Sequence, residues 1–124
     1  MVYEKDRRRL LRAAVKWPTT IITSHGETSG ETKSISQAGV SFYCSESPPI
    51  GRECRLEIQP PHHEPIMVSA KPIWVLEANS LEVSSRFIIG AEFEYISEDD
   101  VLFLGEVIAK QLGKSPISKG KDGP

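Results

Sequence analysis

The sequence predicts an all-β domain that ends in one α-helix, and three observations support this fold class. Short apolar segments recur as far as Ile96, and most of them alternate apolar with polar side chains. Clusters of Gly, Pro and Ser separate these segments, which is typical of strands in a small antiparallel barrel or sandwich. A helical period occurs only after Ile96, where a single helix is placed to cover an open end of the barrel.

Six segments have the composition or the alternation of β-strands. The first segment is rich in β-branched residues, which favour a strand. Pro18 marks an edge or a bend in it, because proline cannot donate a hydrogen bond to a neighbouring strand. Residues 25–30 are rich in turn formers and predict a turn after it. In the last two strands we expect Trp74, Phe87 and Phe93 to lie in the core. The predicted strands cover residues 13–24, 31–36, 40–44, 51–59, 66–77 and 87–96.

The last predicted element is a helix over residues 98–112. Ser97 and the acidic residues after it form a capping box in its aspartate form. Gly113 is placed to end the helix. Four apolar residues recur between these limits at helical spacing, namely Val101, Leu104, Ile108 and Leu112.

The chain is predicted to be one domain with a tail at each end. Its 124 residues, 39% hydrophobic and 26% charged, fit an ordinary globular domain that buries its own core. We expect residues 1–12 to be a flexible arginine-rich arm and residues 13–112 to form the barrel with its helix. Residues 113–124 are expected to be a disordered tail, because they cannot bury enough apolar surface to order themselves.

Composition also limits the compartment and the partners. No apolar run approaches the roughly 20 residues of a membrane span, so we expect a cytoplasmic protein without membrane insertion. Cys44 and Cys54 lie in predicted strands and are too few for a disulfide framework, so free buried thiols are expected. The net charge of −2 argues against wrapping a nucleic acid polymer.

An arginine cluster precedes the first predicted strand. Residues 7–12 contain four arginines, and guanidinium groups bind phosphate in bidentate fashion and stack on aromatic bases. Alone, such a run is usually a solvated arm. A second stretch, Ser34-x-Ser36-x-x-Gly39, makes a binding site the better interpretation.

Together the two stretches resemble the PilZ domain family. Arg8 and Arg12 form Arg-x-x-x-Arg, with Arg7 before them, and the serine motif follows about twenty residues later. Trp74 and Gly90-x-x-Phe93 fall where late strands of that family should be. The resemblance covers residues 6–112, and it implies a six-stranded antiparallel β-barrel with a C-terminal helix. It also implies a bacterial receptor for the second messenger cyclic di-GMP.

The resemblance implies which residues bind cyclic di-GMP. This ligand carries two phosphates and two guanines, so the guanidinium groups of the arginines suit its phosphate oxygens and the guanine O6 and N7 atoms. The hydroxyl groups of Ser34 and Ser36 would bind the ligand from the barrel wall, and Gly39 would let the ligand approach the backbone. For Ser36 and Gly39 an ordinary strand turn is the alternative. The implied ligand-binding residues are Arg7, Arg8, Arg12, Ser34, Ser36 and Gly39.

One departure from the family pattern leaves a second function open. The second motif of the family usually opens with Asp or Asn, whereas this chain has Ser34, which offers one acceptor without charge. The first hypothesis is a receptor in which cyclic di-GMP orders the arm and the new surface signals to an unidentified downstream protein. The alternative is a PilZ-like adaptor that no longer binds the nucleotide and acts through protein contacts.

Other functions have less support. Ser24 and His25 lack a nucleophile elbow and an oriented acid, so no enzymatic activity is expected. His62 and His63 are adjacent and point apart, and no third ligand is spaced to help them, so neither a metal nor a cofactor is expected. An RNA-binding barrel with a basic arm is a third and weaker hypothesis, since the net charge is negative and no aromatic residues pair with the basic ones.

Overall fold

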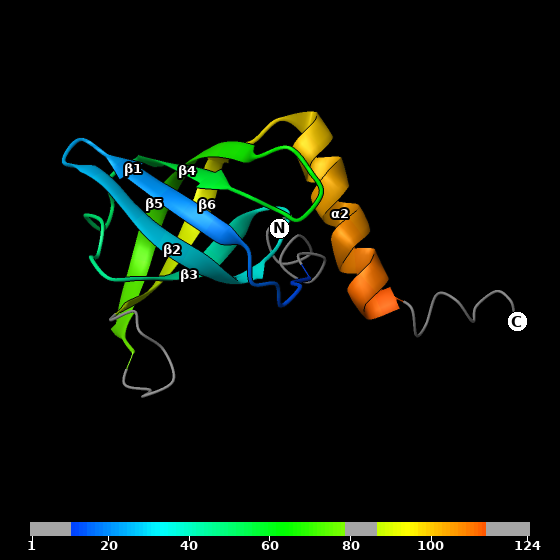
Figure 1. Ribbon diagram of the computed structural model, residues 1–124, viewed down its shortest axis with the longest axis horizontal. Coiled ribbons are helices and arrows are strands. Elements are labelled where there is room, and N and C mark those ends of the chain that lie inside the picture. Colours follow the sequence, from blue (N-terminus) through cyan, green and yellow to red (C-terminus); the bar gives the residue numbers. More distant parts are fainter. Residues whose placement is uncertain (1–10, 79–86, 114–124) are drawn as a thin grey trace, which may run out of the picture.

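The six strands of the described chain close into an antiparallel barrel in the order β1-β2-β3-β6-β5-β4 (Figure 1). The computed structural model describes residues 11–78 and 87–113. The strands are β1 (Pro18–Thr23), β2 (Gly26–Ile35), β3 (Gly39–Cys44), β4 (Cys54–Ile58), β5 (Ile66–Glu77) and β6 (Phe87–Tyr95). This architecture confirms the predicted six-stranded barrel with one C-terminal helix.

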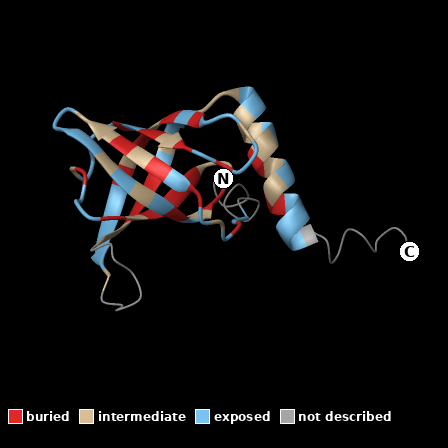
Figure 2. Cartoon of the chain, in the orientation of Figure 1, coloured by how far each residue is buried: buried red, intermediate tan, exposed pale blue. Residues whose placement is uncertain are grey.

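Alternation along the strands places the core inside the barrel (Figure 2). In β4, for example, Cys54, Leu56 and Ile58 are buried, while Arg55 between them is exposed. Phe42 of β3 is fully buried in the same hydrophobic core. Such burial of apolar surface is the main favourable term in folding.

The C-terminal helix, α2 (Glu98–Gly113), lies against one end of the barrel (Figure 1). Ser97 caps it, because its Oγ accepts a hydrogen bond from the Asp100 backbone N–H at 3.2 Å. Leu104 and Ile108 are buried on the side that faces the barrel. Phe103 stacks on His63, with the ring centroids 3.8 Å apart. The predicted helix and its cap are therefore confirmed, with Gly113 as the last helical residue.

The first hairpin differs from its prediction. β1 begins at Pro18 and not at residue 13, and β2 begins at Gly26, so most of the predicted turn over residues 25–30 is strand. Gly30 belongs to this strand because of close packing: a Cβ there would lie 2.3 Å from the Tyr43 carbonyl oxygen. The turn predicted from composition is therefore wrong over most of its length, because Gly30 allows close contact between two strands and does not form a turn. β1 also pairs with β4 on its other side, so Pro18 begins an interior strand of a closed barrel.

The segment before β1 runs beside β2 without forming a regular strand. Ala13 and Ile35 exchange two backbone hydrogen bonds of 2.8 and 2.9 Å. Further along, the Thr32 hydroxyl accepts from the Trp17 N–H at 2.8 Å and donates to the Val15 carbonyl. Because a side chain replaces part of the ladder, the predicted strand over residues 13–17 does not form.

Several remaining expectations concern isolated residues. Cys44 and Cys54 are buried free thiols, as predicted, and desolvation by burial raises the pKa of each to about 11. Phe87 and Phe93 are partly buried and pack against the core. The predicted core position of Trp74 is wrong, since this side chain is 42% exposed.

Some predictions fall outside the residues that the structure describes. The predicted arm is described only at Leu11 and Arg12, and the predicted tail only at Gly113. Within the described ranges, no group of three or more His, Cys, Asp or Glu side chains could hold a metal ion. No helix in these ranges is long and apolar enough to cross a membrane.

Candidate functional site

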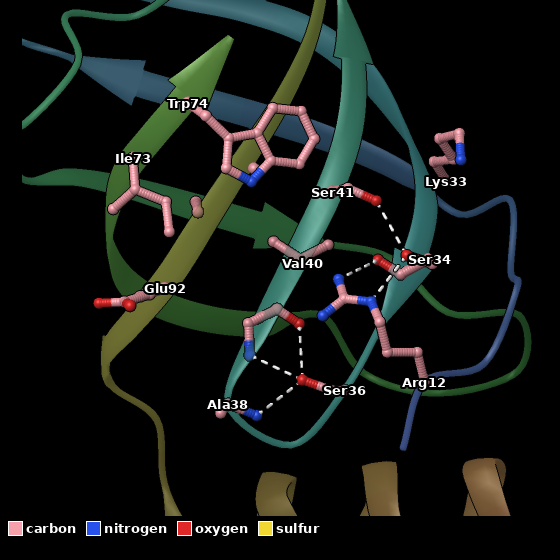
Figure 3. A pocket seen from close by; sticks show the side chains of 13 residues that line it. Arg12, Lys33, Ser34, Ser36, Ala38, Val40, Ser41, Ile73, Trp74 and Glu92 are labelled. Atoms are coloured by element: carbon pink, nitrogen blue, oxygen red, sulfur yellow. Dashed lines mark hydrogen bonds between the residues drawn. The ribbon is translucent and has the colours of Figure 1, made fainter. Parts of the chain in front are cut away.

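A pocket of about 510 Å³ lies on the outer face of the barrel, across strands β2, β3, β6 and β5 (Figure 3). Three parts of the chain that are distant in sequence meet in it. They are the segment before β1, the turn between β2 and β3, and the pair β5 and β6. The lining residues are Arg12, Lys33, Ser34, Ser36, Ala38, Gly39, Val40, Ser41, Ile73, Trp74, Gly90, Ala91 and Glu92.

Cross-strand register builds the floor of this pocket. Four residues are paired neighbours on four adjacent strands, and the row runs from Trp74 through Gly90 and Ser41 to Ser34. The three members after Trp74 are small, so the floor between the two ends of the row stays low. Ser34 and Ser41 also share a hydrogen bond of 2.9 Å between their Oγ atoms. The row therefore forms a shallow shelf with a large side chain at each end, Trp74 at one and Arg12 at the other.

Arg12 is held at its end of the row by Ser34. Its Nε donates to the Ser34 Oγ at 2.9 Å, and one terminal nitrogen donates to the Ser34 carbonyl oxygen at 3.4 Å. The adjacent bridge between Ala13 and Ile35 fixes the backbone from which the side chain starts. Partial burial lowers the pKa of the Arg12 guanidinium, which nevertheless stays charged at neutral pH. These bonds use two of its five N–H donors, so the remainder of the fork can serve an anion.

The turn between β2 and β3 is built by two of the predicted site residues. The Ser36 Oγ accepts hydrogen bonds from the backbone N–H groups of Ala38 and Gly39, both at 3.1 Å, and Ser36 is 1% exposed. A Cβ at Gly39 would lie 2.6 Å from the Ala91 carbonyl oxygen. The glycine therefore lets β3 approach β6. Both residues line the pocket, and their contacts are those of the strand turn given as the alternative above.

Trp74 reaches the pocket because β5 changes register. Pairing between β5 and β6 shifts between Pro72 and Trp74, which leaves Ile73 as an extra residue. Such a bulge re-aims the side chains that follow it. The indole then lies over Gly90, where an added Cβ would meet ring atoms at 2.0 to 2.3 Å. The sequence contained one indication of this, since the apolar run from Ile73 to Leu76 does not alternate.

Charges around the pocket are arranged unevenly. Arg12 and Lys33 come from the side of β2, and Glu92 lies on the far side of the turn, on β6 (Figure 3). Lys33 is the extra residue at the register shift between Thr32 and Ser34 in β2. An anion with a flat apolar part would find cations at one end of the shelf and an aromatic ring at the other.

The structure brings together four of the six residues predicted for the site: Arg12, Ser34, Ser36 and Gly39. Arg7 and Arg8 lie outside the described residues. Sequence reasoning missed Lys33, Ser41 and Glu92 as lining residues, because only the strand register shows that they face the same side.

The sequence of this chain matches a known protein family. The model of the PilZ domain family matches residues 6–110. No curated protein matches the sequence significantly.

Several solved structures share the fold. The inhibitor of motility MotI/DgrA from Bacillus subtilis has a TM-score of 0.73 and 19% identity, over 88% of this chain and 52% of that one. The PilZ domain of YcgR with c-di-GMP from Escherichia coli has a TM-score of 0.68 and 13% identity, over 87% and 93%. The MrkH–c-di-GMP complex of K. pneumonia has a TM-score of 0.67 and 15% identity, over 91% and 56%. The match thus spans about half of MotI/DgrA and of MrkH, and nearly all of the YcgR PilZ domain.

Proposed function

Because this chain belongs to the PilZ domain family, we propose that it is a receptor for cyclic di-GMP, which it binds on the shelf between Arg12 and Trp74. One observation carries the proposal. A guanidinium, oriented by Ser34, faces a floor of small residues that ends at an exposed indole. A ligand with phosphates and purines needs these two groups within reach of each other.

Each part of the shelf suits one part of the ligand. The free donors of Arg12 bind a phosphate oxygen or the O6 and N7 edge of a guanine. The exposed ring of Trp74 offers a flat face on which a purine stacks. Ser34 acts through Arg12, because its hydroxyl already accepts the Nε hydrogen bond. Two of the solved structures with this fold, the YcgR domain and MrkH, contain c-di-GMP.

The residues before Leu11 complete the proposal. Arg7 and Arg8 precede the point at which the chain reaches the shelf, so they supply further guanidinium groups to the same ligand. Ligand binding orders this arm, and the arm with its ligand forms a new surface for a downstream protein. The role proposed for the pocket is binding and not catalysis.

Calorimetric titration with cyclic di-GMP tests the proposal. Arg12→Ala removes the oriented fork and leaves a phosphate or guanine edge unpaired, which should cost about 2–5 kcal/mol of binding free energy. This corresponds to a loss of affinity of about thirtyfold or more. The matched control is Arg52→Ala, which removes the same charge from an exposed residue that does not line the pocket. All titrations are made at one salt concentration, because a nonspecific basic patch responds to ionic strength.

Two results would contradict the proposal in different ways. If Arg12→Ala and Arg52→Ala weaken binding equally, the nucleotide is attracted by net charge and not by the shelf. If the parent protein does not bind cyclic di-GMP at all, the adaptor hypothesis takes its place. Thermal unfolding of each variant shows whether the fold is intact, since Arg12 also contacts β2 through Ser34.

A further inference from the structure

Helix α2 contacts two of the three parts of the chain that meet in the pocket, the segment before β1 and the turn between β2 and β3. Near its end, the Gln111 side chain accepts a hydrogen bond from the Ala14 N–H at 2.8 Å and donates one to the Ala14 carbonyl oxygen at 3.1 Å. Near its start, the Val101 carbonyl oxygen accepts a hydrogen bond of 2.9 Å from Nε2 of Gln37. Ala14 follows Arg12 by two residues, and Gln37 lies inside the turn that begins at Ser36.

The packing of α2 is adapted to these contacts. A Cβ at Gly105 would lie 2.7 Å from Nε2 of Gln37. The helix therefore has a glycine where the Gln37 side chain packs against it. Leu104 and Ile108 are buried against the barrel and keep the helix at this distance. Figure 1 shows the segment that leads into β1 close to the C-terminal half of α2.

The backbone beside Arg12 is consequently clamped from two sides. Ala13 is bonded to Ile35 of β2, and the next residue, Ala14, is bonded to Gln111 of α2. A planar amide that bonds both the N–H and the C=O of one residue fixes its peptide planes as a strand neighbour would. The direction in which the Arg12 side chain leaves the backbone depends on this clamp.

We propose that Gln111 is a positioning residue for the pocket, and that docking of α2 and binding of ligand stabilise one another through it. The inference rests on the proposed function, since it needs a ligand on Arg12. A bound anion fixes Arg12 and with it Ala14, which strengthens the site to which Gln111 binds. Coupling between two equilibria is reciprocal. A protein that captures the C-terminal half of α2 therefore lowers the affinity for ligand, and the ligand opposes that capture.

Gln111→Ala tests the clamp against Leu102→Ala, a truncation at a 64% exposed residue of the same helix. In calorimetry with cyclic di-GMP, Gln111→Ala should lower the affinity about three- to tenfold, as expected for the loss of one or two neutral hydrogen bonds. Leu102→Ala should change it less than about twofold. Gln111→Glu keeps an acceptor for the Ala14 N–H but turns a second acceptor toward the Ala14 carbonyl oxygen, so it should also lower the affinity.

Amide exchange separates coupling from a merely structural role. In the parent, saturating cyclic di-GMP should slow exchange over residues 106–113, and in Gln111→Ala this protection should be lost. Ligand-induced protection of α2 that persists in Gln111→Ala, or an affinity equal to that of the parent, overturns the proposal.

The ligand-free proteins give an independent result. Without nucleotide, Gln111→Ala should speed exchange of the Ala14 amide, whereas Leu102→Ala should not. If the parent does not bind cyclic di-GMP, the proposed function fails, and this comparison alone then decides whether Gln111 holds the segment. If the parent binds and Ala14 exchanges equally in all three proteins, the positioning role fails while the proposed function stands.

Discussion

The two halves of β5 use the same kind of residue for different purposes. In the first half, alternate residues face the core, and Ile66, Val68, Ala70 and Pro72 are buried. In the second half, four consecutive apolar residues are 38 to 59% exposed, namely Ile73, Trp74, Val75 and Leu76. The first half pairs with β4 through Ile66 to Ala70 and begins to pair with β6 at Ser69, whereas the second half pairs only with β6.

The boundary between the halves lies just after the last residue that pairs with β4, and a change of register follows it. A register shift between Pro72 and Trp74 adds Ile73 to β5 without a partner on β6. From this residue on the apolar side chains of the strand are exposed, and two of them, Ile73 and Trp74, form one wall of the pocket. A contiguous exposed apolar surface of this kind usually marks a binding site. The barrel thus obtains its stability from one half of β5 and a part of its candidate site from the other.

The largest expected effect comes from the buried half. Ile66 is fully buried, and Ile66→Ala should lower the free energy of unfolding by about 2–5 kcal/mol, since it removes buried methyl groups and leaves a cavity. The control in the same strand is Leu76→Ala, at a residue that is 59% exposed, which should change it by less than about 0.5 kcal/mol. Urea denaturation of both variants gives the comparison. Equal losses would show that the exposed half is also part of the core.

A smaller effect is expected where the exposed half rests on β6. In Gly90→Ala the new methyl group would occupy the place of the Trp74 ring, which cannot bend away as a long aliphatic chain can. The cost should be about 1–3 kcal/mol of unfolding free energy, as for other overpacked sites. Tryptophan fluorescence should change as the Trp74 ring moves away from Gly90, whereas the contribution of Trp17, which is 7% exposed, should stay the same. An unchanged spectrum with full stability would contradict the close seating of the ring.

Sequence reasoning was most successful where local pattern and tertiary structure agree. The alternation of β4 and the helical period of α2 each bury one face, so the sequence predicts these elements and their inward sides. It failed where a long-range contact decides the conformation. Residues 13–17 have strand composition, but the Thr32 hydroxyl bonds to the backbone of Val15 and Trp17 in place of a full ladder. No local pattern contains that information.

The candidate site was predictable in its residue types and not in their roles. The Arg-x-x-x-Arg and serine motifs identified Arg12 and Ser34, which the structure joins by a hydrogen bond. Their shelf depends on strand register, which places Ser41 and Gly90 between them and Trp74. A one-residue shift in register would turn these side chains to the other face, so the arrangement follows from pairing and cannot be derived from spacing.

The smallest expected effect isolates the contact between Trp74 and Gly90 from everything else in β5. Trp74→Ala removes the indole, which supplies the three nearest atoms that the methyl group of Gly90→Ala would meet. In that background Gly90→Ala should therefore change the free energy of unfolding by less than about 0.5 kcal/mol, although alone it costs more. A small gain would also be consistent, because glycine weakens a strand interior relative to alanine. Denaturation of the parent, both single variants and the double variant completes the cycle. If Gly90→Ala costs the same with and without the indole, the glycine serves the pairing of β6 itself, and the exposed half of β5 owes its pocket wall to the register shift alone.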